Sequence, residues 1–433
     1  RQDEILDLVQ VETGKARRDA FEELFDAANV ARYYARTAKR HLRPRRRRGL
    51  VPGLTSAWEL RHPVGVVGVI APWNYPLTLA VSDALPALVA GNGVVLKPDP
   101  QASFTALWCL CLLYEAGLPG ELFQVVTGDG PETGAALLDA VDYVAFTGST
   151  ATGRIVAARA GERLIGCSLE LGGKNPMVVM EDADLERAAR GAARGCFANA
   201  GQLCISTERI LVQASVHDAF LERLLAATAE LRLGRTLDFD ADVGSLTSPE
   251  QLEKVERHVA DAVEKGARVL VGGRRRPELG PLFYEPTLLA EVTPAMTVCH
   301  EETFGPVASL YRFGSAEEAL AMANDTEYGL NASVWTEDLR FGRRMAARIR
   351  AGTVAVNDAY GAAWGSVDAP MGGMKASGLG RRHGAQGIHT YTESQTVAVQ
   401  RGMALAAPPG LGEERYSRVA SSMLRVMRRV PRD

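Results

Sequence analysis

The stretch Gly65–Pro98 reads GVVGVIAPWNYPLTLAVSDALPALVAGNGVVLKP. Apolar, β-branched runs at 65–70 and 93–97 flank a helix-length segment at 77–90. Short apolar runs bounded by glycine, proline or asparagine are typical of buried strands. The order strand, helix, strand therefore predicts two parallel strands joined by a crossover helix, with both faces of their sheet covered.

This alternation extends over most of the chain. We expect an α/β protein with two doubly wound parallel-sheet domains, joined near the glycine pair at 172–173. Such sheets bind ligands at the carboxyl ends of their strands. The remaining expected strands are 123–127, 143–147, 177–180, 209–212, 269–271 and 352–356, and the remaining helices are 102–116, 132–140, 316–323 and 338–349.

The composition narrows the class of protein. The 433 residues suffice for about two or three packed units, and the net charge of -3 provides no general attraction for nucleic acid. No apolar run has membrane-spanning length and no signal pattern is present, which favours a cytoplasmic protein. Six scattered cysteines are typical of free thiols, and seven histidines without ligand spacing give no reason to expect a metal.

Cys204 is the first candidate for chemistry. It lies in Asn199–Ser206 (NAGQLCIS), where small and polar residues precede the thiol. Cysteine is an intrinsically strong nucleophile even when little of it is thiolate at neutral pH. The alternative interpretation is an inert buried thiol, because free cysteine is among the most buried residue types.

Glu170 is a candidate general base. It stands in LELGGK (169–174), at the end of an apolar run and beside two glycines. Burial there would raise the pKa of the carboxyl group toward neutrality. Alternatively, Glu170 is a surface residue or forms an ion pair with Lys174.

Asn74 follows the first strand in APWNYPL (71–77). A side-chain amide at this place could donate a hydrogen bond to a developing oxyanion. Alternatively, Asn74 caps the helix that begins near Pro76, and the two roles are compatible.

Two further motifs favour a phosphate-bearing ligand. The stretch 146–153 (FTGSTATG) follows a strand and opens a helix, where backbone N–H groups and the helix dipole can receive a phosphate. It is not the GxGxxG fingerprint. Lys97 ends a parallel strand beside Pro98 and points toward the same crevice, unless it is an ordinary lysine that reaches for solvent.

In this order the motifs resemble the successive signatures of the aldehyde dehydrogenase superfamily, from about residue 12 to residue 399. These motifs are PWN at 72–74, KP at 97–98, GSTATG at 148–153, ELGGK at 170–174, GQLC at 201–204, ETFGP at 302–306 and PMGGMKASGLG at 370–380.

The resemblance implies oxidation of an aldehyde to a carboxylic acid with NAD(P). Cys204 would attack the aldehyde to form a thiohemiacetal, and the Asn74 amide and a backbone N–H would hold the oxyanion. After hydride transfer, Glu170 would activate the water that hydrolyses the thioester. Because this glutamate is present, hydrolytic release is favoured over transfer to coenzyme A.

The resemblance also assigns the cofactor site. Lys97 would contact the adenosine ribose and is counted with the catalytic residues as well. Pro100 replaces a glutamate that is usual in NAD-preferring members, so NADP is expected, although Asp99 opposes this and NAD stays possible. The assigned residues are Trp73, Lys97, Gly148, Ser149, Gly153, Glu170, Leu171, Gly172, Glu302 and Phe304.

Within the superfamily, the runs at 164–177, 363–374 and 391–396 look most like bacterial NADP-dependent succinate-semialdehyde dehydrogenases. Members of that group clamp the substrate carboxylate with two arginines, whose positions here hold Ser82 and Ala198. Ser366 alone is a poor anchor for a carboxylate. Either another cation serves, or the substrate is a less polar aliphatic or aromatic aldehyde. The expected substrate residues are Trp73, Phe197, Trp364 and Ser366, with Tyr75 beside them.

The resemblance divides the chain into parts. Residues 1–46 and 62–172 would form the cofactor-binding domain, with its N-terminal part missing, and 173–390 the catalytic domain. Residues 47–61 and 391–400 would form an oligomerisation hairpin of a homodimer or homotetramer, which the run Arg45–Arg48 enters. The basic, amphipathic tail 401–433 either packs on its own protein or contacts a membrane surface or partner.

Two other classes stay open at this point. A catalytically idle structural homologue or fragment would have no physical need for Asn74, Glu170 and Cys204 together. A thiol hydrolase or metal enzyme would need a histidine paired with Cys204 or with other ligands, and no such motif is present.

Overall fold

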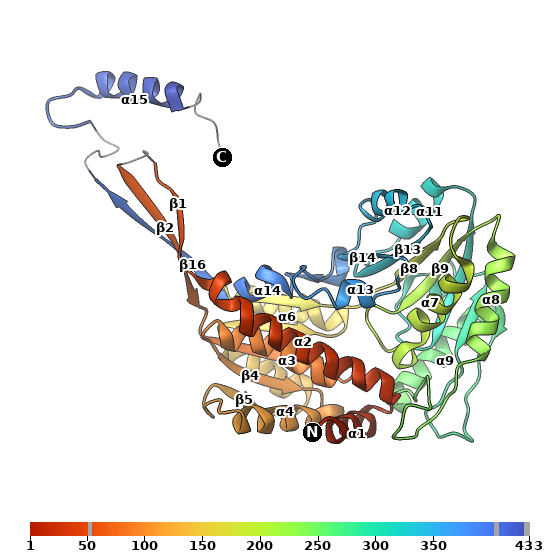
Figure 1. The fold of residues 1–433 in the computed structure, drawn as a ribbon. Helices are drawn as coiled ribbons and strands as arrows, with labels where there is room; N and C mark the ends of the chain where they lie inside the picture. Colours follow the sequence, from red (N-terminus) through yellow and green to blue (C-terminus); the bar gives the residue numbers. More distant parts are fainter. Residues whose placement is uncertain (51–53, 402–406, 428–433) are drawn as a thin grey trace. The chain divides into compact units, whose positions relative to one another are not determined.

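The computed structural model describes residues 1–50, 54–401 and 407–427 (Figure 1). These residues form two compact units. The first comprises 1–41 and 63–392, and the second comprises 42–62 and 393–433.

The N-terminal half of the first unit contains a six-stranded sheet. Its order is β15-β7-β6-β3-β4-β5, and every pairing is parallel except that of β15 with β7. The sheet thereby has one edge where the strands β3, β4, β6 and β7 all end. The strands are β3 (Val66–Ala71), β4 (Gly93–Pro98), β5 (Phe123–Val125), β6 (Tyr143–Thr147), β7 (Gly166–Glu170) and β15 (Gly378–Leu379).

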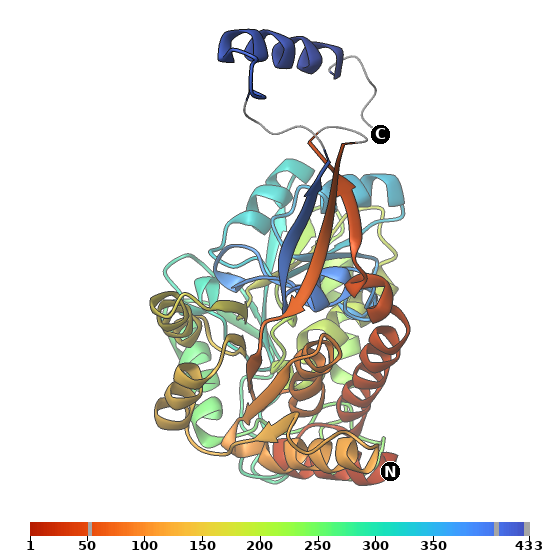
Figure 2. The same cartoon turned by 90° about the vertical axis from the view of Figure 1, so that its left-hand side faces the viewer.

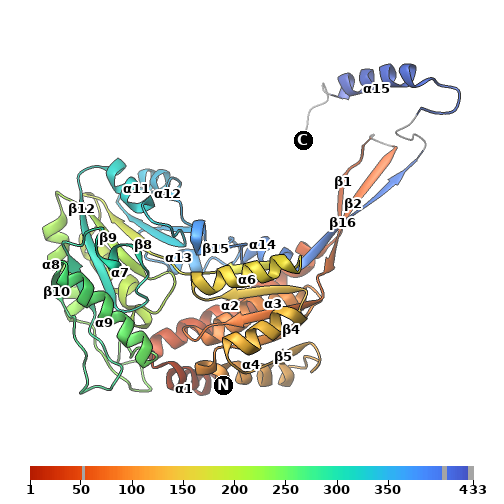
Figure 3. The same ribbon diagram turned by 180° about the vertical axis from the view of Figure 1, so that it is seen from behind.

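Helices cover both faces of this sheet, with α6 in front of it in Figure 3 and α2 behind. Val144, Phe146, Val156 and Leu169 belong to one buried cluster, which fastens α6 to the sheet. The helices are α1 (Gln2–Thr13), α2 (Arg17–Leu42), α3 (Pro76–Val89), α4 (Ser103–Glu115), α5 (Ala135–Ala140), α6 (Thr150–Glu162) and α14 (Gly384–His389).

The other half of the first unit contains a seven-stranded sheet, ordered β10-β11-β12-β9-β8-β13-β14. All of its pairings are parallel except that of β10 with β11. Its strands are β8 (Asn175–Val179), β9 (Thr207–Gln213), β10 (Arg268–Val271), β11 (Thr287–Ala290), β12 (Val307–Phe313), β13 (Asn331–Trp335) and β14 (Thr353–Val356). Its helices are α7 (Leu185–Phe197), α8 (His217–Ala229), α9 (Pro249–Glu264), α10 (Thr297–His300), α11 (Ala316–Asn324), α12 (Leu339–Ala346) and α13 (Gly361–Trp364).

The predicted α/β fold with two parallel sheets is confirmed, with corrections in detail. The strand expected at 269–271 is β10 at 268–271, which lies at the edge of the sheet and is antiparallel to its neighbour β11. The helix expected at 132–140 begins with a π-helical turn at Gly130–Gly134, and the helix expected at 338–349 ends at Ala346. β11, β12 and β13 were not expected.

The second unit is a small sheet followed by a helix (Figure 2). Its strand order is β1 (Arg45–Arg48), β2 (Thr55–Pro63) and β16 (Thr392–Gln400). The basic run therefore forms an edge strand, in which the side chain of Arg47 forms an ion pair with Glu59. Helix α15 (Glu413–Met427) follows, and residues 51–53, 402–406 and 428–433 of the expected hairpin and tail lie outside the described residues. None of the described helices is long and apolar enough to cross a membrane.

Candidate active site

A cavity of about 220 Å³ opens at the carboxyl ends of β3, β6 and β7. Its walls come from both sheets of the first unit. Most of the expected catalytic and cofactor residues meet here. The lining residues are Pro72, Trp73, Asn74, Thr147, Gly148, Ser149, Glu170, Leu171, Gly172, Cys204, Gln251, Lys254, Glu302 and Phe304.

Cys204 reaches this cavity through an unusual turn at the end of α7. Asn199, Ala200 and Gly201 have φ values of 50°, 53° and 71°, so three successive residues are left-handed. A Cβ on Gly201 would lie 2.0 Å from the carbonyl oxygen of Gly305, so only glycine fits there. As a residue, Cys204 is half-buried. Burial and the carboxylates of Glu302 and Glu170 raise the pKa of Cys204 to about 12, so it rests as a thiol.

Asn74 projects its amide between the two loops that form the site. Its Nδ2 donates to the carbonyl of Gln202 at 3.0 Å, and the Nδ2 of Asn199 donates to the same carbonyl at 3.0 Å. The carbonyl of Asn74 accepts from Asn199 Nδ2 at 3.0 Å and from Lys15 Nζ at 2.6 Å. The N-cap residue of helix α3 is Tyr75, and the N–H groups of Leu77 and Thr78 in its first turn donate to the carboxylate of Glu23, so the helix-capping interpretation of Asn74 is wrong.

Glu170 ends β7 and stands opposite Thr147 in the sheet register. Burial raises the pKa of Glu170 to about 7, and the nearby Arg382 opposes this rise. Lys174 pairs with Glu208 instead, so the alternative of a Glu170–Lys174 ion pair is wrong. Glu170 can therefore gain and lose a proton near neutral pH, as a general base requires.

Glu302 lines the same cavity as Glu170, and its carboxyl group has a similarly raised pKa. Burial and the neighbouring Glu208 raise the pKa of Glu302 to about 7. Its Oε1 accepts a hydrogen bond from the backbone N–H of Gly173 at 2.8 Å. A Cβ on Gly172 would lie 2.5 Å from Glu302 Oε2, so the glycine pair lets the carboxylate approach the backbone.

The rim of the cavity suits a dinucleotide. Ser149 is the N-cap of α6, and its Oγ accepts from the N–H of Thr152 at 3.2 Å. The first turn of α6 and Gly148 therefore offer an anion site at the cavity wall. Trp73 and Phe304 meet edge to face with ring centroids 5.6 Å apart, which gives an apolar wall.

Comparison with known proteins decides the family. The sequence profile of the aldehyde dehydrogenase family matches residues 1–397. The chain belongs to the aldehyde dehydrogenase family. It is therefore an NAD(P)-dependent oxidoreductase that acts on aldehydes.

Relatives of this aldehyde dehydrogenase extend the match. It is 53% identical over 429 residues to a protein of Mycolicibacterium smegmatis named "Putative succinate-semialdehyde dehydrogenase", NADP(+) type, covering 99% of this chain and 83% of the relative. It is 38% identical over 403 residues to 3-sulfolactaldehyde dehydrogenase of Pseudomonas putida, covering 92% and 81%. The crystal structure of an NAD-dependent aldehyde dehydrogenase from Sinorhizobium meliloti superimposes with a TM-score of 0.90 at 40% identity, covering 95% and 80%.

Some expected residues of the dehydrogenase lie outside the cavity lining. Lys97 is buried at the end of β4, where its Nζ donates to the carbonyl of Pro98 at 3.1 Å, so it does not reach solvent. Gly153 lies in the first turn of α6 on its buried side, where a Cβ would collide with Leu171. Four lining residues were not among the expected site residues. Pro72 and Thr147 lie within recognised motifs, whereas Gln251 and Lys254 lie on α9 without any motif.

The expected substrate residues are dispersed. Of the four, only Trp73 lines the catalytic cavity. Trp364 packs edge to face on Tyr75 with a centroid distance of 6.1 Å. Ser366 is exposed and donates to the carbonyl of Ala362 at 2.7 Å. Phe197 lines a different cavity.

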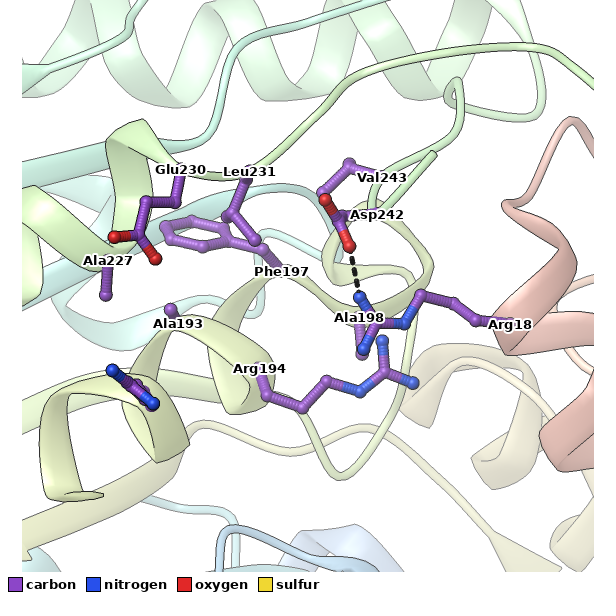
Figure 4. Close-up of a pocket in the computed structure, with 11 residues that line it drawn as sticks. Arg18, Ala193, Arg194, Phe197, Ala198, Ala227, Glu230, Leu231, Asp242 and Val243 are labelled. Carbon is purple, nitrogen blue, oxygen red and sulfur yellow. Dashed lines mark hydrogen bonds and ion pairs between the residues drawn. The ribbon is translucent and has the colours of Figure 1, made fainter. Parts of the chain in front are cut away.

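This second cavity, of about 290 Å³, lies beside α7 (Figure 4). We call it the α7 cavity. Arg18 and Arg194 extend toward Ala198 within it, and Arg18 pairs with Asp242. Among residues 1–50, 54–401 and 407–427, no group of three or more His, Cys, Asp or Glu side chains is placed to hold a metal ion.

Proposed function

We propose that this dehydrogenase oxidises succinate semialdehyde to succinate with NADP, and that it releases the acid by hydrolysis. The observation that carries the chemistry is the meeting of Cys204, Asn74 and Glu170 at one cavity. A nucleophile, an oxyanion donor and a base around one space suffice for acyl transfer to water.

The first step concerns the thiol. With a pKa of about 12, Cys204 must give up its proton before it attacks the aldehyde carbon. Glu170, with a pKa of about 7, is the carboxylate that can accept this proton. The Asn74 amide then donates to the oxygen that becomes negatively charged, and one such donor is typically worth about 3 kcal/mol of barrier.

A bound nicotinamide cofactor would supply the hydride acceptor for the oxidation. Gly148 and Ser149 would hold its pyrophosphate, and Glu302 with Phe304 would hold its nicotinamide ribose. Glu170 then takes a proton from the water that attacks the thioester. Because Glu302 holds its carboxylate by the Gly173 N–H, it is oriented to accept hydrogen bonds from a ribose.

NADP is proposed for two reasons. The relatives at 51% and 53% identity carry NADP(+) in their names. In this chain Pro100 begins a short 3-10 turn after β4, so no carboxylate stands at that position to repel a 2′-phosphate. Asp99 is nearby, but its carboxylate caps that turn by accepting from the N–H of Gln101 at 3.0 Å.

Succinate semialdehyde is proposed from the names of the same relatives. A less polar aldehyde is the second candidate, and a specific observation favours it. The hydroxyl of Ser82 faces Thr78 and the carboxylate of Asp26, and Ala198 carries no polar group, so neither position offers a cation to a substrate carboxylate.

The test is a panel of initial rates. Succinate semialdehyde, propanal, hexanal and benzaldehyde are compared by kcat/KM, each with NADP and with NAD. We expect the highest value for succinate semialdehyde with NADP, and no activity in Cys204→Ala. A preference for hexanal would select the second candidate, and an undiminished rate in Cys204→Ala would refute the mechanism.

We also propose the organisation of the working enzyme. The six-stranded sheet would bind the cofactor, the seven-stranded sheet would carry the nucleophile, and the sheet β1-β2-β16 would join subunits into a homodimer or homotetramer. Sedimentation of the protein with and without residues 393–433 tests this assembly. Cytoplasmic location is expected from the sequence, and contact of the basic helix α15 with anionic vesicles is testable by co-sedimentation.

A further inference from the structure

Glu170 is enclosed by a hairpin from a distant part of the chain. Met371 and Arg382 pair through two backbone hydrogen bonds of 2.9 and 2.8 Å. The hairpin presses Gly372 against the base, because a Cβ on Gly372 would lie 3.0 Å from Glu170 Oε1. The segment 371–382, which contains β15, is therefore part of the environment of the carboxylate.

Arg382 brings a buried positive charge to this place. Its side chain is 10% exposed and pairs with Asp83 of α3, which is 8% exposed. The same guanidinium lies 3.3 Å from Thr147 Oγ1, and Thr147 lines the catalytic cavity opposite Glu170 in the sheet. The pair is thus immediately behind the cavity wall.

The ion pair of Arg382 and Asp83 is held in place by a further hydrogen bond. The second oxygen of Asp83 accepts from the hydroxyl of Tyr391 at 3.0 Å. The Nε of Arg382 is buried without a hydrogen-bond partner among the described residues. Burying a pair with an unsatisfied donor costs free energy, so the arrangement is not explained by stability alone.

We propose that Arg382, anchored by Asp83 and Tyr391, is a positioning residue that keeps Glu170 ionised and therefore competent as the base. This inference rests on the proposed function, in which Glu170 activates water. Arg382 acts through Glu170 and contacts neither substrate nor cofactor.

The electrostatic signs make the role testable. The charged and titratable groups that face Glu170 are Arg382, Arg381, Asp83 and Cys204. The charge of Arg382 lowers the pKa of Glu170, and the charge of Asp83 raises it. Removing the two charges one at a time must therefore shift the pKa of Glu170 in opposite directions, which general damage to the fold would not do.

The experiment measures kcat against pH between about 5.5 and 9, with saturating aldehyde and NADP. The acidic limb of the kcat–pH profile is the range in which kcat falls because Glu170 becomes protonated. In Arg382→Gln we expect this limb to move up by about one pH unit, since one nearby charge typically has an effect of this size. In Asp83→Asn we expect the limb to move down. Arg382→Lys keeps the charge and should stay close to the wild type.

Two variants guard against loss of the fold. Asp83→Asn combined with Arg382→Gln leaves a neutral pair that can still form hydrogen bonds, and we expect an upward shift smaller than that of Arg382→Gln alone. Arg17→Gln removes another buried arginine, which pairs with Asp7 and Asp3 outside the cavity, and should leave the limb unchanged. Circular dichroism melts confirm that each variant is folded.

The outcomes distinguish failure of the positioning role of Arg382 from failure of the proposed dehydrogenase function. If the wild type oxidises no aldehyde of the panel, the proposed function fails. If the wild type is active but the limbs of Arg382→Gln and Asp83→Asn coincide with it or move in the same direction, only the positioning role fails. Glu302 also titrates near pH 7, but neither Arg382 nor Asp83 is among the groups that shift its pKa.

Discussion

The catalytic cavity and the α7 cavity have similar volumes, about 220 and 290 Å³, but they differ in whether their charged side chains form ion pairs. In the α7 cavity each arginine has a carboxylate partner. In the catalytic cavity, among the residues that the structure describes, Glu170 and Glu302 form no ion pair within 4 Å. The paired arginines are Arg18 with Asp242, Arg190 with Glu186, and Arg194 with Asp19 and Glu22.

This difference indicates which of the two cavities carries out proton transfer. A paired arginine stays charged over the whole neutral range. An unpaired, buried carboxyl has its pKa moved toward neutrality, and can therefore exchange protons at the working pH. Charges in the catalytic cavity should cost stability and supply activity, whereas charges in the α7 cavity should supply stability only. The predictions below test both halves of this comparison.

The largest effect is expected in Glu170→Gln. The amide cannot take a proton from water, so we expect kcat to fall by about 10³-fold, within the range typical of a lost general base. Intact-protein mass spectrometry after mixing with aldehyde and NADP separates the two steps that Glu170 serves: a thioester that accumulates on Cys204 places the loss in hydrolysis, and its absence places the loss in activation of the thiol. An unchanged kcat would contradict the assignment.

Asn74→Ala should follow, with kcat reduced by about 10²-fold through loss of one oxyanion donor. Asn74→Asp is the matched control, because it keeps the shape but replaces the donor by a second acceptor, and it should be at least equally impaired. Alkylation of Cys204 by iodoacetamide forms no oxyanion, so its rate should change less than about twofold in Asn74→Ala. A parallel loss of alkylation would mean that the loop, rather than the amide, was damaged.

The sequence was informative where local pattern and chemistry coincide. The β-branched runs at β3, β4 and β6 were found because buried parallel strands are almost continuously apolar. Cys204, Glu170 and Asn74 stand beside strand or helix ends within short motifs, so their types and neighbours sufficed to find them. β11 and β13, with sequences TLLA and NASVW, are too short and too mixed to be distinguished from loops.

Contacts between distant residues could not be predicted. Arg382 and Asp83 are 299 positions apart, and Lys15 is 59 positions from Asn74, so nothing local indicates that either pair meets. Phe197 and Trp364 were expected at the substrate because aromatic residues line apolar pockets, but packing supplies the same composition. Their role in substrate binding stays a prediction, as does that of Ser366.

Glu302→Gln tests the cost of an unpaired carboxyl. The pKa of Glu302 is raised from 4.5 to about 7, so the folded state favours the protonated form. The stability that this contributes is complete at low pH and is lost as the pH rises through 7. At pH 8 we therefore expect the variant to unfold with about 2 kcal/mol more free energy than the wild type, allowing for partial solvent screening of the shift. At pH 4.5 the two should differ little. Urea unfolding at both pH values measures this, and an equal difference at both would contradict it.

The smallest effect is expected in Arg18→Ala, on the other side of the comparison. The side chain of Arg18 is 42% exposed and that of Asp242 is 18% exposed, so the pair should contribute about 0.5 to 1 kcal/mol to stability. We expect kcat to change less than about twofold for every aldehyde of the panel, and a double-mutant cycle with Asp242→Asn should show that the two residues act as a pair.

The KM of Arg18→Ala for succinate semialdehyde and for hexanal provides a further test. Arg18 lines the α7 cavity together with Ala198 and extends toward it (Figure 4), and position 198 is one of the two at which the resemblance in the sequence leads us to expect a clamping arginine. If Arg18→Ala raised KM tenfold for succinate semialdehyde but left hexanal unchanged, the α7 cavity would receive the substrate carboxylate. The division between a chemical and a structural cavity would then be wrong. An unchanged KM for both aldehydes would leave that division intact and place the carboxylate elsewhere.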